Sequence, residues 1–292
     1  MMKKIAVLIT VYNRIDKTVK CLTTLFDSIR TYTDLSLDVY ITDDGSSDGT
    51  SNILGGTFPF PNLHILQGNG QLYWNGGMIN SWKSALGVGG YDGYLWLNND
   101  VELFSCLWNE LLEADKYSIE KFGQSGVYIG STCDSNRLHL TYGGFNFTNK
   151  WTLKDSFVIP NGTFQSCQCG HGNITYVAHD VVSKIGILCD KYWHGGGDHD
   201  YTFMAYKKGI PQFILREYVG ICENDHHYDV LMNVGLKERI KYLYSPLGFN
   251  LHNTLLFQKR CFPYRYPFVL ICGYMKAIWP KGYSKLYQLL RK

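Results

Sequence analysis

The chain has 292 residues, of which 45% are hydrophobic and 18% are charged, so it can bury a sizeable core as ordinary globular proteins do. Its formal net charge of +3 is too small to argue for nucleic acid as a partner. No stretch approaches the ~20 apolar residues of a membrane span.

Strand and helix patterns alternate through the first hundred residues. Residues 4–10 form an apolar run that predicts a buried strand, and apolar residues at helical spacing predict a helix from about Asp16. Further strands are predicted at 37–42, 63–66 and 93–97, with a glycine-punctuated loop at 68–77 and a helix at 78–86. This order predicts an α/β fold with a mainly parallel sheet.

Polar and acidic residues follow two of these strands directly. Asp43 and Asp44 open a Gly/Ser-rich turn after the second strand, and Asn98, Asn99 and Asp100 follow the strand at 93–97. Open α/β sheets bind ligands at the carboxyl ends of their strands. A carboxylate beside amides suits Mg²⁺ or Mn²⁺, which prefer oxygen ligands. The alternative is a strand that simply ends in a polar loop.

The glycine-rich segments do not make a dinucleotide-binding fingerprint. Neither Gly68-Asn-Gly70 nor residues 87–90 continue as G-x-G-x-x-G, and the first strand leaves through Thr10-Val-Tyr-Asn, which contains no glycine. This argues against a nicotinamide-dependent oxidoreductase.

A second chemical centre lies in the second half of the chain. Patterns predict a helix at 104–122, strands at 126–131 and 172–178, antiparallel strands between them, and a short helix at 179–186. Three glycines then precede Asp198 and Asp200, at the start of a helix predicted over 200–208. A carboxylate here can serve as a general base toward a hydroxyl, or it can simply cap the helix.

Histidine and cysteine residues supply further candidate ligands. His226 and His227 follow strand-like pieces at 212–216 and 218–222, and a neutral imidazole can complete a metal site that a carboxylate begins. Two surface histidines in a polar loop are the alternative. The segment Cys167-Gln-Cys169-Gly-His171 lacks a second cysteine pair at zinc spacing, so a zinc cluster is not expected.

The nine cysteines and the C-terminal composition bear on location. The apolar run near the N-terminus is too short for a secretory signal, so we expect a cytoplasmic protein with reduced, mostly buried thiols. From Leu236 onward the sequence is basic and aromatic. That composition suits contact with the anionic inner face of the plasma membrane, and it also suits an ordinary helical tail with a solvated face.

Four segments, taken in order, resemble the family 2, inverting glycosyltransferases of the GT-A fold. They are Thr10–Arg14, Thr42–Thr50, Leu97–Val101 and Gly197–Tyr201. The segment Gln71–Met78 is similar to the branch that builds bacterial polysaccharides, which includes rhamnosyltransferase-like proteins. The resemblance implies a Rossmann-like GT-A domain over residues 1–235, with a nucleotide-binding half (1–101) and an acceptor half (102–235) that carries a smaller mixed sheet. A helical segment, 236–292, would follow as a candidate membrane-associating element.

The resemblance also implies roles for individual residues. Asp44 matches the aspartate that bonds the nucleotide base, Asp100 the metal-binding acid of the D-x-D motif, and Asp198 the catalytic base, with Asp200 as the alternative. The first acid of that motif is Asn98 here, and the glutamate that usually precedes the base is Gly197. The other implied donor-binding residues are Thr10, Tyr12, Asn13, Asp43, Trp74, Asn75 and Asn99. His226 or His227 would add a ligand to Mn²⁺ or Mg²⁺.

The implied reaction transfers a sugar from a UDP- or dTDP-sugar to a hydroxyl of a saccharide acceptor, with inversion. A metal ion would stabilise the departing diphosphate, and one carboxylate would take the proton. A lipid-linked acceptor in capsule or O-antigen synthesis is the implied context. A sugar-phosphate nucleotidyltransferase would need a Gly-rich phosphate loop with Arg or Lys after the first strand, which residues 11–14 do not supply. A non-catalytic carbohydrate-binding protein would not need Asp100 or Asp198.

Overall fold

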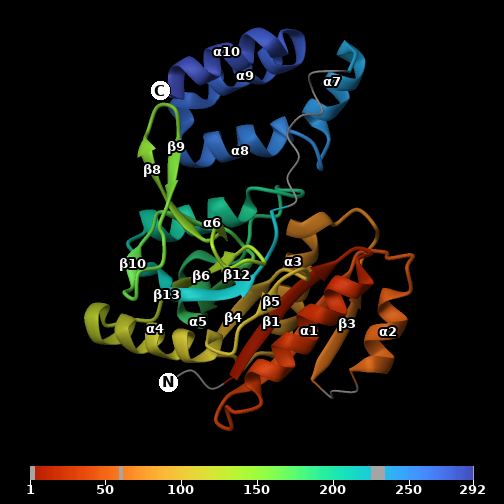
Figure 1. Cartoon of the computed structure of the whole chain (residues 1–292), viewed down its shortest axis with the longest axis vertical. Coiled ribbons are helices and arrows are strands. Elements are labelled where there is room, and N and C mark those ends of the chain that lie inside the picture. The colour runs from red at the N-terminus through yellow and green to blue at the C-terminus, as the bar shows by residue number, and fades with distance from the viewer. Residues whose placement is uncertain (1–3, 59–61, 225–233, 292) are drawn as a thin grey trace.

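The computed structural model describes residues 4–58, 62–224 and 234–291. Within these residues a ten-stranded sheet crosses the molecule, and eight of its strands follow the order β10-β13-β6-β12-β4-β1-β2-β3. Helices cover both of its faces, and a separate group of C-terminal helices lies beyond it (Figure 1).

The N-terminal half is the alternating α/β unit that the sequence predicts. Its strands are β1 (Lys4–Val11), β2 (Ser36–Asp43), β3 (Leu63–Gln67) and β4 (Gly93–Leu97), and its helices are α1 (Ile15–Ile29), α2 (Thr50–Thr57) and α3 (Tyr73–Val88). β1 pairs in parallel with both β2 and β4, and β2 pairs in parallel with β3. Because β1 and β4 are buried on both faces, their sequences are continuous apolar runs without alternation.

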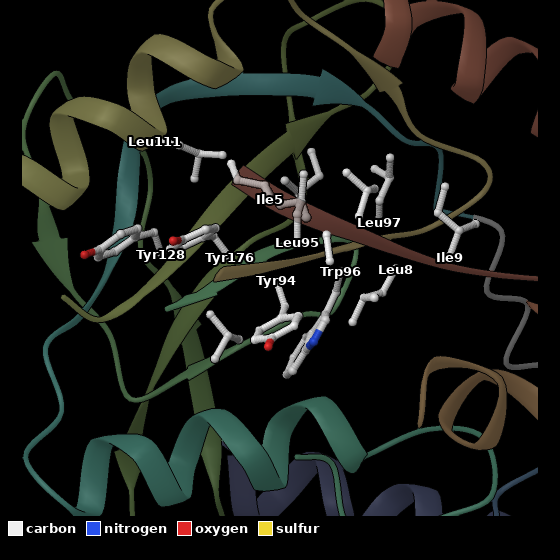
Figure 2. Close-up of a cluster of buried hydrophobic side chains, with 14 of the residues drawn as sticks. Ile5, Leu8, Ile9, Tyr94, Leu95, Trp96, Leu97, Leu111, Tyr128 and Tyr176 are labelled. Carbon is white, nitrogen blue, oxygen red and sulfur yellow. The ribbon is translucent and has the colours of Figure 1, made fainter. Parts of the chain in front are cut away.

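Side chains of neighbouring strands form the main core. Figure 2 shows Leu95 and Leu97 on the side of the sheet that faces Leu111 of α4, while Tyr94 and Trp96 point to the opposite side. Trp96 there packs edge-on against Tyr201 of α6, with ring centroids 5.2 Å apart. The core thus ties the strand that precedes Asn98 to the helix that carries Asp198.

The C-terminal half of the sheet mixes strand directions. β12 (Ile174–Ala178) is antiparallel to both β4 and β6 (Val127–Cys133), and β13 (Gln212–Ile221) is parallel to β6. The helices here are α4 (Leu107–Phe122), α5 (His179–Ile185) and α6 (Gly197–Lys207), and the short strands β5 (Glu102–Leu103), β7 (Leu140–Tyr142) and β10 (Gln165–Ser166) pair at the edges. The mainly parallel α/β sheet that the sequence predicts is confirmed.

The smaller second sheet is antiparallel, as the sequence patterns between residues 131 and 172 predicted, whereas the family resemblance implied a mixed sheet. It has the order β11-β8-β9, formed by β8 (Gly144–Asn149), β9 (Lys154–Phe157) and β11 (Cys169–Gly170). β8 and β9 are joined by only four residues, and a connection this short permits only antiparallel pairing.

Some element boundaries differ from the predicted ones. α3 begins at Tyr73, so Trp74 and Asn75 lie in a first helical turn and not in a loop. α2 was not expected, because Gly55 and Gly56 are poor helix formers. α6 begins at Gly197, three residues earlier than predicted, and β13 is a single irregular strand where two pieces were predicted.

Residues 236–291 form a helical group at the end of the molecule away from the sheet (Figure 1). It comprises α7 (Leu236–Tyr244), α8 (Leu251–Cys261), the 3₁₀ turn η2 (Pro263–Arg265), α9 (Tyr266–Ile278) and α10 (Pro280–Arg291). Among the described residues, no helix has both the length and the apolar character that a membrane crossing requires. All nine cysteines are free thiols, and six of them are buried.

Candidate functional site

The candidate site lies along the edge where the parallel strands β1, β2 and β4 end. The loops that follow these strands carry the predicted donor-binding residues. Because β12 runs antiparallel to β4, the residues that precede β12 reach the same edge, and the Asn98 backbone N–H donates to the Asn173 carbonyl over 2.9 Å. The edge therefore collects residues from both halves of the chain.

Asp44 organises the loop between β3 and α3. One carboxylate oxygen accepts the backbone N–H of Gly70 and the other accepts that of Tyr73, both at 2.8 Å, and the residue is only 3% exposed. A Cβ on Gly68 would lie 2.6 Å from the Asp44 carboxylate, so this loop needs glycine where it passes. Each oxygen keeps a lone pair for a further donor.

Asp43 and Asn13 brace the loop after β2. The Asp43 carboxylate accepts the Ser46 N–H over 2.9 Å and the Ser51 hydroxyl, and the Asn13 amide oxygen accepts the Ser47 N–H over 2.9 Å. Asn13 adopts a left-handed backbone with φ of 55°. These contacts shape the loop, and they leave Asp43 only 2% exposed.

Thr10 and Tyr12 leave β1 in different environments. A Cβ on Gly77 would lie 2.0 Å from the Thr10 hydroxyl, so the close packing of α3 on β1 requires glycine there. The Tyr12 side chain is 59% exposed at the strand exit. Of the two, Tyr12 is the freer to meet a ligand.

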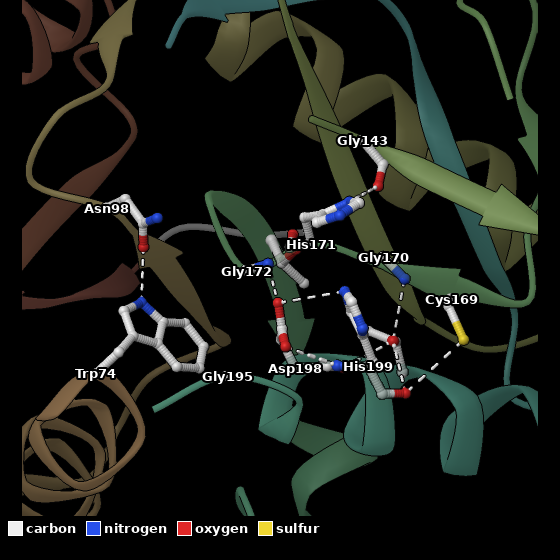
Figure 3. A network of polar contacts seen from close by, with 12 residues as sticks. Trp74, Asn98, Gly143, Cys169, Gly170, His171, Gly172, Gly195, Asp198 and His199 are labelled. Atoms are coloured by element: carbon white, nitrogen blue, oxygen red, sulfur yellow. Dashed lines mark hydrogen bonds and ion pairs between the residues drawn. The ribbon is translucent and has the colours of Figure 1, made fainter. Parts of the chain in front are cut away.

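Trp74 and Asn98 are joined across the edge. The Trp74 indole N–H donates to the Asn98 side-chain oxygen over 2.7 Å (Figure 3). A Cβ on Gly172 would lie 2.5 Å from the Trp74 ring and 3.3 Å from the Asp198 Cβ, so Gly172 sits between these two side chains. This contact brings Trp74 of the donor half close to Asp198 of the acceptor half.

Asn75 and Asn99 point inward. The buried Asn75 amide donates to the carbonyls of Cys189 and Tyr192, over 2.9 and 3.0 Å, and so holds the segment before α6 onto α3. Asn99, 9% exposed, donates to the Thr18 hydroxyl over 2.9 Å. The side-chain nitrogens of both predicted donor-binding amides thus donate to protein groups.

Position 197 holds a glycine where the resemblance implies a glutamate, and packing explains this difference. A Cβ at this position would lie 2.0 Å from the Asn75 side-chain oxygen. A glutamate cannot fit here unless Asn75 moves, because 2.0 Å is far inside contact distance. The residue pair Asn75 and Gly197 therefore forms one packing unit between α3 and α6.

Asp100 forms an ion pair with Arg14, a residue for which the sequence predicted no role. The Arg14 guanidinium donates to Asp100 Oδ2 over 3.0 Å, and the Cys222 thiol lies 3.7 Å from Oδ1. The Arg14 side chain is 52% exposed, whereas that of Asp100 is 17% exposed. The signal was available, since Arg14 closes the Thr10–Arg14 segment.

A divalent ion needs several oxygen ligands, and the described residues supply few. In residues 4–58, 62–224 and 234–291 no group of three or more His, Cys, Asp or Glu side chains could hold a metal. Asp100 therefore fits a metal only as one ligand, with the others drawn from elsewhere, as a diphosphate would provide. The predicted ligands His226 and His227 lie outside the described residues.

Asp198 stands at the first turn of α6 with both oxygens directed by backbone donors. Oδ2 accepts the Gly172 N–H and Oδ1 the His199 N–H, each over 2.9 Å (Figure 3). Burial alone would raise the pKa of Asp198, but His199, His171 and these two N–H donors outweigh it and hold the pKa below its ordinary value. Asp198 is therefore an ionised carboxylate at neutral pH.

Two histidines flank Asp198, and neither was predicted from the sequence to be a site residue. The His199 Nε2 atom lies 3.9 Å from Asp198 Oδ2, and the rings of His171 and His199 meet edge-on at 4.9 Å. Burial, with His199 nearby, lowers the pKa of His171 to about 4. His171 is then neutral, and its Nδ1 donates to the Gly143 carbonyl over 2.9 Å.

Asp200, the alternative base, is bonded to side chains of α8. Its carboxylate accepts the Arg260 Nε–H over 2.8 Å and the Cys261 thiol over 3.5 Å, and it is 2% exposed. Asp200 thus fastens α6 to α8. Of the two carboxylates, Asp198 is the one at the strand edge.

Residues 6–113 match the family described as "Glycosyl transferase family 2". No curated protein matches the sequence. Among solved structures, S. aureus TarS (residues 1–349) in complex with UDP is similar with a TM-score of 0.57 and 13% identity, over 99% of this chain and 91% of that one. The mannosyltransferase PcManGT from Pyrobaculum calidifontis, in complex with GDP-Man and Mn²⁺, is similar with a TM-score of 0.51 and 14% identity, over 98% and 78% of the two chains.

The sheet order, the loops at its carboxyl edge and these structural neighbours define a protein of the GT-A fold. The sequence similarity to the family 2 glycosyltransferases covers residues 6–113 of the 292-residue chain.

Proposed function

We propose that this glycosyltransferase moves a hexosyl group from a UDP- or dTDP-sugar to a hydroxyl of a saccharide acceptor, with inversion at the anomeric carbon. One observation carries the proposal: the ionised Asp198 and the Trp74–Asn98 pair flank Gly172, at the edge where the family places its donor. A carbohydrate-binding protein would have no use for such a carboxylate.

The donor side of the proposal rests on the loops after β1, β2 and β4. Asp44 retains lone pairs for a nucleobase N–H. Tyr12 offers an exposed aromatic face and directly follows Val11, whose carbonyl accepts the Asp44 N–H over 2.8 Å. TarS structures are described with UDP and with UDP-GlcNAc, and PcManGT with GDP-Man. Thr10, Asn13, Asp43, Asn75 and Asn99 would then act by shaping the donor site, since protein groups hold them.

Asp100 is the proposed ligand of Mn²⁺ or Mg²⁺, with His226 or His227 as an added ligand. When bound, the ion would offset the negative charge that develops on the departing nucleoside diphosphate. Arg14 is positioned to share that task, because its guanidinium already sits 3.0 Å from Asp100 and presents several N–H donors suited to phosphate. Release of Asp100 would free this guanidinium for the donor.

Asp198 is the proposed general base. Its carboxylate would accept the proton of the acceptor hydroxyl as that oxygen attacks the anomeric carbon opposite the leaving diphosphate. The N–H donors of Gly172 and His199 fix the carboxylate in place, and the first turn of α6 favours its negative charge. One displacement with one base inverts the anomeric centre.

The domain boundaries follow the same proposal. Residues 1–101 would bind the nucleotide, residues 102–235 would bind the acceptor, and residues 236–292 would form a separate functional segment. The proposed setting is the synthesis of capsule, O-antigen or another bacterial surface polysaccharide, on the cytoplasmic side.

The test compares Asp198→Asn with Asp200→Asn in a transfer assay with UDP- and dTDP-sugars. Loss of a general base should lower kcat by about 10²- to 10⁴-fold in Asp198→Asn while nucleotide binding stays intact. Asp200→Asn should remain active at low temperature but melt earlier, because Arg260 loses its ionic partner. Full activity in Asp198→Asn would refute the assignment of the base.

A further inference from the structure

Helix α9 presents an apolar face to solvent. Its only charged residue is Lys276, whose ammonium lies 3.5 Å from the centre of the Phe249 ring. Ile271 and Ile278 are seven residues apart, two turns along one face, and they are 59% and 65% exposed. Tyr274, between them, is 40% exposed. An exposed apolar helix face of this kind normally marks a site of contact with another protein or with a membrane.

This face continues beyond both ends of α9. Trp279, which follows the helix, is 62% exposed, and Tyr264, which precedes it, is 48% exposed. The Tyr264 ring packs at 5.2 Å against Trp151, which is 73% exposed in the turn between β8 and β9. The Tyr264 hydroxyl also donates to the Lys150 carbonyl over 2.9 Å. The hairpin and the helical group therefore present one surface.

We define the C-terminal apolar surface as Trp151, Tyr264, Phe268, Ile271, Ile278 and Trp279. Half of these residues are Trp or Tyr, the side chains enriched where a bilayer meets water. Figure 1 places α9 and α10 at the end of the molecule, beyond α8 and away from the sheet, so nothing in the described chain covers them from outside.

Charge is strongly segregated along the chain. Residues 236–292 hold eleven of the 28 Lys and Arg residues but one of the 25 Asp and Glu residues, which gives this segment a formal charge of +10. The remaining residues, 1–235, hold the other 17 basic and 24 acidic residues and carry −7. Lys281 and Lys285 are exposed on α10, next to α9.

We propose that the C-terminal apolar surface docks on an anionic lipid bilayer, with α9 lying in the interface. The apolar face would enter the headgroup boundary, and the positive segment would attract anionic lipids. A helix of 13 residues spans about 20 Å, short of the ~30 Å hydrocarbon core, so α9 lies on the membrane and does not cross it. Two copies joined by this surface would bring two segments of +10 together, which disfavours a dimer.

Docking would fix the position of the catalytic half relative to the membrane. Arg260 of α8 is bonded to Asp200, and the Asn253 amide donates to the Gly195 carbonyl over 2.7 Å. The Trp193 and His252 rings stack at 4.6 Å. The helical group is thus fastened to the segment that leads into Asp198. Membrane docking does not depend on the proposed function, but it would hold the acceptor side near a lipid-linked saccharide.

The test is flotation of the full chain with vesicles of phosphatidylcholine and phosphatidylglycerol, and with pure phosphatidylcholine vesicles. We expect binding to the anionic vesicles that weakens at high salt, as surface electrostatics require. Ile271→Glu/Ile278→Glu should reduce the bound fraction at least about tenfold, because charges replace the inserted side chains. The control is Val88→Glu at the end of α3. Val88 is 62% exposed, close to Ile271 and Ile278, and this variant should bind as the wild type does.

A milder variant, Ile271→Ser/Ile278→Ser, and the thermal midpoint of each protein distinguish a loss of membrane binding from a loss of folding. Wild-type protein that stays unbound at every vesicle composition, or a glutamate variant that floats equally well, would overturn the proposal. So would a wild-type dimer in sedimentation that the same variant dissociates, since a second copy would then be the occupant. Nucleotide binding, measured on the same samples, reports separately on the donor site.

Discussion

At the scale of single residues, the neutral His171 beside Asp198 should make the stability of the fold depend on pH. Its pKa in the folded chain is about 4, below the ordinary value of 6.5, so the unfolded chain binds this proton first as pH falls. Stability should therefore be full above about pH 6.5, fall as the pH drops, and level off below about pH 4, with a total loss of at most about 3 kcal/mol.

Urea unfolding between pH 7 and pH 5 measures this loss. In His171→Asn the amide can still donate to the Gly143 carbonyl but cannot gain a proton, so the slope of unfolding free energy against pH should shrink. An unchanged slope in His171→Asn would mean that another group carries the acid sensitivity.

At the scale of elements, α3 and α6 meet at Asn75 and Gly197. Gly197→Ala would place a Cβ 2.0 Å from the Asn75 side-chain oxygen, whereas a Cβ on Gly195 meets nothing within 4 Å. Overpacking of this kind costs roughly 1–3 kcal/mol, which lowers the thermal midpoint of a chain this size by several degrees. Calorimetry should find that shift in Gly197→Ala and little change in Gly195→Ala; equal midpoints would contradict the packing account.

The alternating elements of the N-terminal half could be predicted because each is a local pattern. Buried β1 and β4 are apolar runs, and α1 repeats apolar residues at helical spacing. The start of α3 could not be predicted, because Gly76 and Gly77 argue locally against a helix. Tertiary packing explains the glycine at position 77, because α3 lies so close to β1 that a larger residue there would clash with Thr10.

The candidate site shows the same limit. Sequence motifs selected Asp44, Asp100 and Asp198, and the structure brings the last near Trp74 at one edge. A local sequence pattern does not predict contacts between residues that are far apart in sequence. Examples are the pair Arg14 and Asp100, 86 residues apart, and the pair Asp200 and Arg260, 60 residues apart. The roles of Asp200 and Asn75 as braces therefore emerge only from the fold.

The whole molecule combines three parts with different tasks. In the proposed function, the N-terminal unit would supply loops for a nucleotide and the second half would supply Asp198 at the same edge. The C-terminal helices add a positive, partly apolar end. The Arg260–Asp200 ion pair links the last two parts. Donor binding is the step on which proton removal by Asp198 depends in this proposal, whereas membrane docking is independent of it.

The most direct test is the thermal midpoint of the full chain with UDP, dTDP, GDP and their sugar conjugates, with and without Mn²⁺. A ligand that binds only the folded chain at a hundred times its Kd adds about 2.7 kcal/mol of stability. We predict a rise with UDP or dTDP that requires Mn²⁺ and disappears in Asp100→Ala, while Asp198→Asn keeps it. If no nucleotide raises the midpoint with any metal, the donor site assigned to Asp44 and Asp100 is wrong.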